Sequence, residues 1–553
     1  MVLKNKAKYR KMFFLLPYLR PYKMKCLRCI LEIILLSILT LPLPGLNGKC
    51  IDVLTKREEA NIFVECLCLM VVINVIKVAI SVNTKIKVAE VGNSVVNSIK
   101  VELSCKTMFL PMNYVNSTNK GYIFSRISEC ENIRTLFSSN IVSLLLGGID
   151  FALSFFAIFL IDFRLATVTF AFLPILFIMM NYNSKRMAKS TEEVAEYTAK
   201  NSSIIVNMID SIKYIKIFDI YRLQEDKILG SMKKLLHKQN QKAKWITIYG
   251  ESIQLISGLH NLIILAFAGY LIYEGQISIG IYITYIGYSS KVFGNILSLT
   301  GFGVLLNPVL VSIKRIQEFL GLENESNGII KTDNVINRIV FENVFFKYKK
   351  NNEKFILNDF CCEITKDKPT LLVGNNGTGK TTLISLILGL YEIDEGNITI
   401  DKVDIRECEK TQLRNCISYM SQETGLFEGS LEENLIVGQK KPIDIKKKLE
   451  ELNLYTLLER FDFNLQYPIL HNGVNLSGGG QKQIVSFLRV AIQERSIIIL
   501  DEPTNFLDAN TKYIFWKFIK KYYISKRILI LVTHDENIKN DIEVGDMQII
   551  KFV

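Results

Sequence analysis

Six long apolar stretches occupy the first 306 positions, and they constrain the fold more than any other feature. They cover residues 27–46, 61–82, 137–160, 164–183, 248–273 and 281–306. A helix of about 20 residues is long enough to cross the ~30 Å hydrocarbon core of a bilayer. We therefore predict six transmembrane helices, of which the second is interrupted by Asn74 and Lys77.

The basic excess of the chain lies in this apolar half. Residues 1–335 carry 38 basic and 24 acidic side chains, whereas residues 336–553 carry 29 and 30. Residues 1–25 include eight basic side chains and no acidic one. Basic segments beside apolar spans are typical of the cytoplasmic side of a membrane protein. We predict a multi-pass inner-membrane protein with a cytoplasmic N-terminus, a lipid bilayer as partner and no nucleic acid.

The segments between the spans read as helices. Residues 84–110 and 186–245 contain almost no Pro or Gly and carry apolar side chains at helical spacing. We expect them to extend the spans as long helices, and we expect residues 12–19 to form an elbow helix along the membrane surface.

Ionisable side chains inside spans are candidates for a substrate pathway. Glu32, Asp150, Glu251 and His260 are of this kind. Each of them equally suits a helix interface. Tyr282, Tyr285 and Tyr288 recur near helical spacing on the last span, where packing is the favoured interpretation.

A glycine-rich loop marks the second half of the chain, in which β-rich runs alternate with helices. Such alternation indicates a parallel α/β sheet. The loop follows the apolar residues 370–373 and consists of Gly374, Asn375, Asn376, Gly377, Thr378, Gly379, Lys380, Thr381 and Thr382. Glycines let backbone N–H groups approach phosphate oxygens, and a helix N-terminus adds positive potential. We expect Lys380 to reach the β- and γ-phosphates and Thr381 to ligate Mg²⁺.

Two further motifs suit the same chemistry. The apolar residues 497–500 are followed by Asp501 and Glu502. The Asp501 carboxylate, at the end of a strand, suits coordination of Mg²⁺. The Glu502 carboxylate suits a general base that polarises water. A second glycine-rich turn opens the helical run 482–492 and reads Leu476, Ser477, Gly478, Gly479, Gly480 and Gln481.

Together these motifs resemble the nucleotide-binding domain of an ATP-binding-cassette (ABC) transporter, and residues 1–320 resemble the transmembrane domain of an ABC exporter. The resemblance implies a six-helix transmembrane exporter domain (all-α) fused to a C-terminal α/β P-loop nucleotide-binding domain. It predicts a transmembrane domain over residues 1–320, a linker over 321–335 and an ATP-binding cassette over 336–553.

The resemblance also assigns roles to single residues. It implies ATP and Mg²⁺ as cofactors, with Thr381, Gln422 and Asp501 as metal ligands and Glu502, His534 and Gln422 as catalytic residues. Tyr348 is then the residue that stacks on adenine. Residues 476–481 become the signature that closes on ATP held by the opposite protomer, and residues 505–508 resemble the loop that follows the catalytic strand.

The sequence departs from the family pattern in places. The signature holds one glycine more than usual, so either Ser477 or the backbone of Gly478–Gly480 faces the phosphate. Ile484 stands where the family usually has arginine. In the membrane half, residues 121–126 and 210–218 resemble the two inner segments that couple the domains.

By this resemblance the chain is a half-transporter that pairs with a second copy of itself or with a related half-transporter. We expect ATP-driven export by alternating access, with a small antimicrobial peptide as the favoured substrate. The alternatives are a multidrug or lipid exporter that takes amphipathic small molecules and, third, an ATP-switched regulator without transport. No protease domain precedes the first span, so we expect export without cleavage of a leader peptide.

Overall fold

A computed structural model describes residues 11–57, 59–118, 120–333, 335–348, 355–375, 377–439, 442–476, 478–533 and 547–552. The chain divides into two compact units. A membrane unit contains Met1–Met108 and Gly121–Leu322, and an α/β unit contains Phe109–Lys120 and Glu323–Val553. The domain boundaries predicted at residues 320 and 335 stay predictions.

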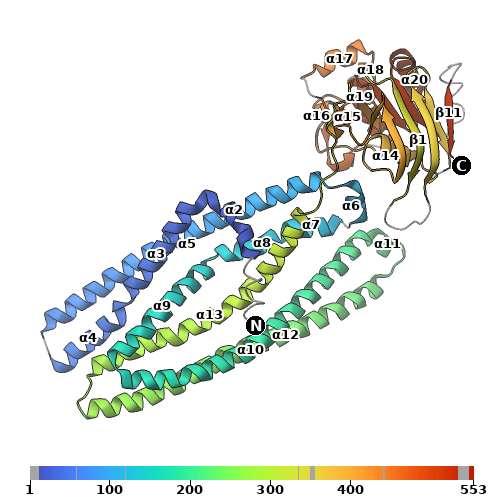
Figure 1. Ribbon diagram of the computed structural model, residues 1–553. Coiled ribbons are helices and arrows are strands. Elements are labelled where there is room, and N and C mark those ends of the chain that lie inside the picture. Colours follow the sequence, from blue (N-terminus) through green and yellow to red (C-terminus); the bar gives the residue numbers. More distant parts are fainter. Residues whose placement is uncertain are drawn as a thin grey trace. The chain divides into compact units, whose positions relative to one another are not determined.

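The membrane unit consists of helices, several of which run far beyond the apolar stretches (Figure 1). The helices are η1 (Lys11–Leu15), α2 (Leu16–Leu19), η2 (Arg20–Tyr22), α3 (Lys23–Thr40), α4 (Pro42–Lys56), α5 (Ala60–Met108), α7 (Lys120–Ser128), α8 (Cys130–Arg134), η3 (Thr135–Phe137), α9 (Ser139–Ile161), α10 (Phe163–Asp210), α11 (Ile212–Ile217), α12 (Tyr221–Tyr273) and α13 (Ile279–Leu320). Helices α5, α10 and α12 have 49, 48 and 53 residues. The predicted long helices are therefore confirmed, apart from the break around α11.

Five helical segments among the described residues are long and apolar enough to cross a membrane. They are Met12–Lys56, Ala60–Met108, Gly121–Ile161, Phe163–Asp210 and Tyr221–Tyr273. These segments contain the first five predicted spans. The sixth predicted span lies within α13, which is not among the five, so the count of six stays a prediction.

Prolines divide the first span into α3 and α4. Pro42 and Pro44 have no N–H group, so the carbonyl groups of Ile38 and Thr40 lose their usual i+4 donors. The N–H of Leu41 donates to the Ile38 carbonyl across 3.2 Å and closes a tighter turn there. The Thr40 carbonyl is left for a donor from another helix.

Contacts between helices account for three of the polar and aromatic side chains that the sequence marked inside the spans. Helix α10 lies along α12, and α13 packs against α9 and α4. Tyr285 is fully buried and its hydroxyl donates to the Leu165 carbonyl across 2.7 Å. His260 is also fully buried, with Nε2 at 2.9 Å from the hydroxyl of Thr169. Glu32 accepts hydrogen bonds from Arg28, Asn83, Thr84 and Lys87.

The α/β unit contains a five-stranded parallel sheet in the order β11-β3-β10-β9-β6. Its strands are β3 (Thr370–Gly374), β6 (Ile417–Met420), β9 (Ile497–Asp501), β10 (Ile528–Val532) and β11 (Gln548–Phe552). Every residue of β9 and β10 is buried. Continuous apolar runs suit strands that are covered on both faces. The predicted α/β class is confirmed.

A four-stranded antiparallel sheet, which the sequence did not predict, has the order β2-β1-β4-β5. Its strands are β1 (Arg338–Phe346), β2 (Leu357–Thr365), β4 (Glu395–Ile400) and β5 (Val403–Asp404). The remaining elements are α6 (Met112–Ser117), α14 (Lys380–Ile387), α15 (Lys410–Asn415), β7 (Gly429–Ser430), α16 (Leu431–Ile436), α17 (Ile445–Glu451), α18 (Tyr455–Arg460), β8 (Pro468–Ile469), η4 (His471–Gly473), α19 (Gly478–Ile492) and α20 (Ala509–Tyr522).

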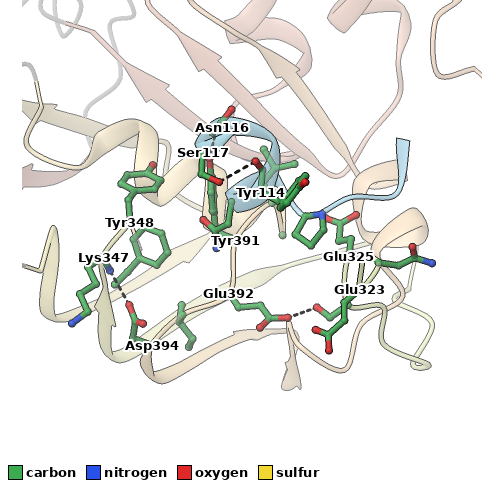
Figure 2. A pocket seen from close by; sticks show the side chains of 18 residues that line it. Tyr114, Asn116, Ser117, Glu323, Glu325, Lys347, Tyr348, Tyr391, Glu392 and Asp394 are labelled. Atoms are coloured by element: carbon green, nitrogen blue, oxygen red, sulfur yellow. Dashed lines mark hydrogen bonds between the residues drawn. The ribbon is translucent and has the colours of Figure 1, made fainter. Parts of the chain in front are cut away.

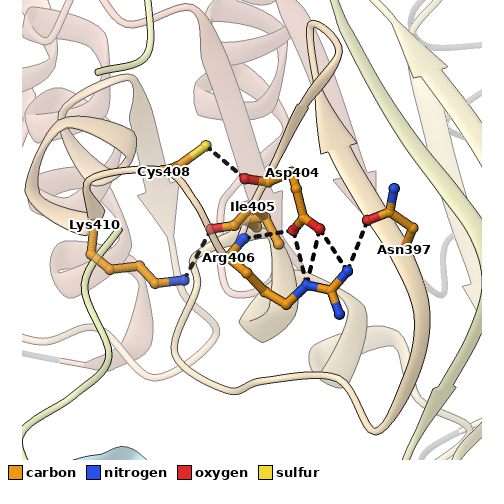
Figure 3. A network of polar contacts seen from close by, with 6 residues as sticks. All are labelled: Asn397, Asp404, Ile405, Arg406, Cys408 and Lys410. Atoms are coloured by element: carbon orange, nitrogen blue, oxygen red, sulfur yellow. Dashed lines mark hydrogen bonds and ion pairs between the residues drawn. The ribbon is translucent and has the colours of Figure 1, made fainter. Parts of the chain in front are cut away.

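The β4–β5 hairpin is held by its turn and by a polar network beyond it. Asp401 and Lys402 both have positive φ angles, 43° and 76°, as a two-residue type I′ turn requires. Arg406 donates to both carboxylate oxygens of Asp404 and to Asn397, as Figure 3 shows. The hairpin therefore fixes the edge of the antiparallel sheet.

Candidate functional site

The motifs from the second half of the sequence follow neighbouring parallel strands. The glycine-rich loop follows β3, Thr533 follows β10, Asp501 ends β9, and Gln422 lies two residues after β6. Val532 lies opposite Asp501, and Met420 lies opposite Leu500. Because the carboxyl ends of parallel strands meet at one edge, the fold gathers these residues where α/β sheets bind ligands.

The glycine-rich loop connects β3 to the N-terminus of α14. Gly377 and Gly379 have φ angles of 84° and 113°, a region that residues with side chains rarely adopt. A Cβ atom on Gly377 would meet nothing within 4 Å, so the backbone there is open to a ligand. At the other end of the loop, a Cβ atom on Gly374 would lie 2.6 Å from the Phe552 carbonyl oxygen of β11.

Lys380 begins α14 and lies over the loop. Its side chain is buried, and Nζ donates to the carbonyl oxygen of Asn375 across 2.9 Å and to that of Gly374. The hydroxyl of Thr378 also donates to the Asn375 carbonyl, across 2.9 Å. Thr381 is exposed at the first turn of α14. A loop with open backbone, an ammonium group and an exposed hydroxyl at a helix N-terminus suits a polyphosphate.

Glu502 follows β9 in a left-handed backbone conformation, with a φ of 48°. The Glu502 N–H donates to the carbonyl of Val532 across 2.8 Å. Gln483 Nε2 donates to the backbone carbonyl of Glu502 across 3.1 Å. Gln422 Nε2 donates to Oε2 of Glu502 across 3.0 Å, and Asn505 donates to the same oxygen. The structure thus brings together two of the predicted catalytic residues and holds the carboxylate by two amides.

Asp501 is buried beside a tyrosine that the sequence did not single out. The Tyr419 hydroxyl of β6 donates to Oδ2 of Asp501 across 3.4 Å. Burial, together with the neighbouring carboxylate, raises the pKa of Tyr419 well above its usual range. Tyr419 therefore stays protonated and serves as a fixed donor to Asp501.

The signature lies beside the loop that follows β9. Gly478 begins α19, and Gly479 and Gly480 lie against Phe506, which has a φ of 65°. A Cβ atom on Gly479 would lie 2.5 Å from the Phe506 ring, and one on Gly480 would lie 2.8 Å from the Phe506 carbonyl oxygen. The glycines therefore make room for Phe506. Ile484, the residue that stands in place of arginine, is fully buried in the core.

Three of the predicted site residues, Asn376, Ser477 and His534, lie outside the described residues. Of the others, Thr382 is buried, and its hydroxyl shares a hydrogen bond of 3.2 Å with the Tyr348 hydroxyl. Leu476, the first residue of the signature, is buried in the core, and Gln481 lies in the first turn of α19.

Tyr348 lies at the wall of a cavity of about 790 Å³ in the α/β unit (Figure 2). Its ring meets the ring of Tyr391 edge-on, with centroids 5.1 Å apart. Tyr391 in turn accepts a hydrogen bond of 2.6 Å from Asn116 of α6. The sequence analysis missed Tyr391 and Asn116, because nothing in a local motif links positions 275 residues apart.

This contact corrects the first of the expected coupling segments. Residues 121–126 lie in α7 of the membrane unit, whereas the segment that packs into the α/β unit is Phe109–Lys120, with α6. The N–H of Glu325 donates to the Phe109 carbonyl across 2.7 Å.

The donor set also suits Mg²⁺ held through nucleotide phosphates. The edge of the sheet offers one hydroxyl, from Thr381, one buried carboxylate, from Asp501, and one amide, from Gln422. Mg²⁺ prefers oxygen ligands and is commonly bound by one or two carboxylates together with substrate phosphates. Among the described residues no group of three or more His, Cys, Asp or Glu side chains suits a metal on its own.

Comparison with known families matches both halves of the chain. Residues 27–297 match the ABC transporter transmembrane region, and residues 357–505 match the family described as ABC transporter. The chain therefore belongs to the ABC transporter family and has the architecture of an exporter half-transporter. Its α/β unit is the ATP-binding domain of an ATPase that is coupled to transport across a membrane.

Known relatives extend over most of the chain. A putative multidrug export ATP-binding/permease protein of Bacillus subtilis (strain 168) is 25% identical over 459 residues, 81% of this chain and 79% of the relative. The ATP-dependent lipid A-core flippase of Pasteurella multocida (strain Pm70) is 23% identical over 461 residues, 82% of this chain and 79% of the relative.

A solved structure has the same fold. The structure of a bacterial Atm1-family ABC exporter with ATP bound superposes with a TM-score of 0.81, covering 96% of this chain and 93% of that chain. The two sequences are 18% identical, so this likeness concerns the fold alone.

Proposed function

We propose that this chain forms a dimeric exporter that uses ATP hydrolysis to move amphipathic molecules out of the cell by alternating access. The observation that carries the proposal is the pairing of Gln422 with Glu502 beside the phosphate loop. A carboxylate held by amide donors at the edge of a P-loop sheet is suited to polarise an attacking water. Long helices in the same chain are suited to pass the resulting movement to the membrane.

Each residue of the site then has a distinct task. Tyr348 stacks on adenine, and the loop from Gly374 to Thr382 binds the phosphates with Lys380. Thr381, Asp501 and Gln422 hold Mg²⁺, which neutralises charge on the phosphates. Glu502 is the general base, and His534 contacts the γ-phosphate.

The signature supports a dimer. One chain holds both a phosphate loop and a second anion-binding turn, the signature. In a dimer, the phosphate loop of one protomer and the signature of the other bind the same nucleotide. The tip of the α10–α12 pair adds a surface suited to a partner, since Tyr214, Ile217 and Phe218 are each more than half exposed. We favour a homodimer, because Glu502 and the phosphate loop are both intact in this chain. A related half-transporter is the alternative partner.

The charge distribution supports an orientation in a bacterial cell membrane with the N-terminus and the ATP-binding domain in the cytoplasm. Long segments such as residues 186–245 are rich in lysine, whereas the short loops at the opposite helix ends are nearly balanced. Basic residues remain on the cytoplasmic side and meet anionic lipid there.

The names of the relatives bear on the class of molecule that is transported. The names of the relatives speak of multidrug export and of lipid A-core flipping. Those names support drugs or lipids as amphipathic substrates, whereas the small peptide that the sequence favoured has no support from them. We therefore propose an amphipathic drug or lipid and keep the peptide as the alternative.

Reconstitution of the full chain in phosphatidylethanolamine–phosphatidylglycerol vesicles tests the proposal. The probes are a rhodamine dye, a phospholipid with a fluorescent acyl chain and a dye-labelled amphipathic peptide. We expect ATP-dependent movement of the dye or the lipid, and no movement with Glu502→Gln. The exposed Glu459→Gln serves as the matched control. ATP hydrolysis without movement of any probe would instead support an ATP-switched regulator, and movement of the peptide alone would restore the peptide hypothesis.

A further inference from the structure

Gln483 lies on α19, two residues after the signature, and only 5% of its surface is exposed. Its Nε2 donates to the backbone carbonyl of Glu502 across 3.1 Å. Because a carbonyl oxygen can only accept, the amide nitrogen must face Glu502 and the amide oxygen must point elsewhere. Among the described residues, Oε1 of Gln483 has no hydrogen-bond partner.

A buried amide whose oxygen is left unsatisfied is a poor choice for stability alone. An unpaired buried acceptor costs free energy, and an apolar side chain such as Met fills the same volume without this cost. What Gln483 adds over Met is the N–H group that it donates to Glu502. The unsatisfied oxygen therefore indicates that the contact serves the site and not the core.

The backbone of Glu502 needs such support. Its φ angle of 48° is one that residues with a Cβ atom rarely adopt, and it persists only where the surrounding structure holds it. The carbonyl of Val532 accepts from the Glu502 N–H across 2.8 Å. The Glu502 carbonyl accepts from Gln483 and, at a longer 3.4 Å, from the Asn505 N–H. Asn505 belongs to the same loop, whereas Gln483 anchors this carbonyl to a different element, α19.

The first turns of α19 meet the loop after β9 at two places. Gly479, Gly480 and Gln483 lie on one face of the helix, because residues three and four positions apart are neighbours. Gln483 holds Glu502, and the two glycines lie against Phe506 of the same loop. The residues of α19 that follow are mostly buried in the core of the α/β unit. The start of α19 and the loop that carries Glu502 are therefore expected to move together.

We propose that Gln483 is a positioning residue that fixes the backbone of Glu502 and links this base to the signature helix. The inference rests on the proposed function, in which Glu502 is the general base, and adds how the base is kept in place. In the proposed dimer, the signature on α19 binds the ATP of the other protomer, while Glu502 acts on the ATP of its own phosphate loop. Gln483 then joins the two ATP sites through a single side chain.

Gln483→Met keeps the volume of the side chain and removes the donor. We expect kcat for ATP hydrolysis to fall about 10- to 100-fold, because a small misplacement of a reactive group has an effect of this size. The KM for ATP should stay within about twofold, since the phosphate loop is unchanged. Steady-state ATPase assays on the full chain in nanodiscs measure both quantities.

Gln493→Met is the matched control for this variant. Gln493 follows α19 directly and is half-buried, with Nε2 donating to the Val437 carbonyl across 2.7 Å and Oε1 accepting from Ser418 across 2.9 Å. Its replacement removes structural hydrogen bonds away from Glu502. We expect it to lower the melting temperature and to leave kcat as it is.

Gln483→Glu separates positioning from packing. A neutral carboxylic acid donates to the Glu502 carbonyl, whereas a carboxylate has no donor and repels that oxygen. Burial raises the pKa of a carboxyl group, so the neutral form gains population as the pH falls from about 8 to about 6. The kcat of Gln483→Glu, divided by that of the unaltered chain, should therefore rise over this range. The same ratio for Gln483→Met should stay level.

Mixed dimers, purified through two different tags, show which ATP site Gln483 serves. One dimer carries Gln483→Met and Glu502→Gln in the same protomer, and the other carries them in opposite protomers. Positioning within one chain predicts that the first dimer is as active as a dimer with Glu502→Gln alone in one protomer. The second dimer should be slower by about tenfold or more. The reverse order would show that Gln483 acts on the ATP of the other protomer, and would overturn the proposal.

Unchanged kcat in Gln483→Met, an equal loss of kcat in Gln493→Met, or the lack of a pH trend in Gln483→Glu would also overturn the proposal. If Gln483→Met does not fold, the pH trend of Gln483→Glu decides alone. Near-normal hydrolysis in Glu502→Gln would instead contradict the proposed base itself. An inactive Glu502→Gln together with a fully active Gln483→Met would leave the proposed function standing and remove only the positioning role.

Discussion

The side-chain amide of Gln422 donates a hydrogen bond to the carboxylate of Glu502 across 3.0 Å. The two residues are 80 positions apart in the chain and meet because β6 and β9 are parallel neighbours. This contact ties the loop after β6 to the expected general base. It therefore gives the clearest targets for mutation.

Replacement of Glu502 by Gln keeps the shape of the side chain and removes the base. We expect the ATPase rate to fall by about 10²- to 10⁴-fold, because a positioned general base contributes that much. ATP binding should persist, since the phosphate loop is unchanged. Steady-state ATPase assays and binding of a fluorescent ATP analogue measure the two effects. Near-normal hydrolysis would contradict the assignment, and Glu459→Gln controls for loss of a surface carboxylate.

Gln422→Ala removes the amide that orients Glu502 and leaves the carboxylate itself. We expect the ATPase rate to fall about 10- to 100-fold, as is usual when a residue that orients a reactive group or metal ligand is lost. ATP affinity in the absence of Mg²⁺ should stay within about twofold. Gln466→Ala, at an exposed glutamine of the same unit, is the control. If kcat is unchanged, the contact has no part in hydrolysis.

Lys380→Ala removes the ammonium group over the phosphate loop. Hydrogen bonds to charged groups contribute about 1.5–3 kcal/mol, so ATP affinity should fall about tenfold or more. Equilibrium binding of a fluorescent ATP analogue to the purified chain measures this. The exposed Lys366→Ala should leave the affinity as it is. Unchanged affinity in Lys380→Ala would contradict the role of the loop.

Gly479→Ala places a methyl group 2.5 Å from the ring of Phe506. We expect a loss of about 1–3 kcal/mol in the free energy of unfolding, the usual cost of overpacking. Phe506→Ala alone should cost little, because the side chain is 78% exposed. The double variant should recover most of the loss, with a coupling energy above about 0.5 kcal/mol in a thermal-melting cycle.

The control for that cycle is Gly425→Ala, since a Cβ atom there would meet nothing within 4 Å. If Gly479→Ala is as stable as Gly425→Ala, then Phe506 moves aside freely and the glycine is not needed for packing.

Asp508→Ala removes the N-cap of α20. The Asp508 carboxylate accepts from the Thr511 N–H across 3.0 Å and from its hydroxyl across 2.9 Å. The Thr511 N–H lowers the pKa of Asp508, with help from the Thr511 hydroxyl and Arg460. Loss of such a cap costs about 1 kcal/mol of the free energy of unfolding.

The pH dependence of this loss has a defined sign. The folded-state pKa of Asp508 is below the unfolded value of about 3.9, so the stabilisation is complete above that value. It disappears as the pH falls through the folded-state pKa. The melting temperatures of the unaltered chain and of Asp508→Ala should therefore differ at pH 7 and converge in acid. Asp508→Asn keeps a cap that does not titrate, so it should be close to the unaltered chain at pH 7 and more stable than the unaltered chain in acid.

The sequence predicts the ATP-binding edge well because its chemistry is local. The glycines before Lys380 and the acids after residues 497–500 are adjacent in the chain, and parallel strands bring such ends to one edge. The contact between Gln422 and Glu502 follows from that rule once both are placed after strands. The packing of Phe506 on Gly479 does not, because it depends on an uncommon φ angle that no motif encodes.

The membrane unit is less predictable from sequence. Apolar length predicts the first five spans, yet it does not show that prolines free the Thr40 carbonyl or that Lys291, 251 residues later, donates to it. Likewise the segment that packs into the α/β unit, with α6 (Met112–Ser117), is short and carries no motif, so the sequence does not distinguish it from the neighbouring residues 121–126.

The position of β3 has a consequence for how the protein is made. Both neighbours of this strand, β10 and β11, are encoded after it, and β11 begins only at Gln548, long after β3 ends at Gly374. At about 5–20 residues per second, β3 leaves the ribosome about 10–35 s before its outer neighbour exists. Leu371 and Leu372, which are buried in the finished sheet, spend that interval uncovered. We therefore expect the nascent chain to be most prone to aggregation, and most in need of a chaperone, while the strand that carries the phosphate loop awaits its partners.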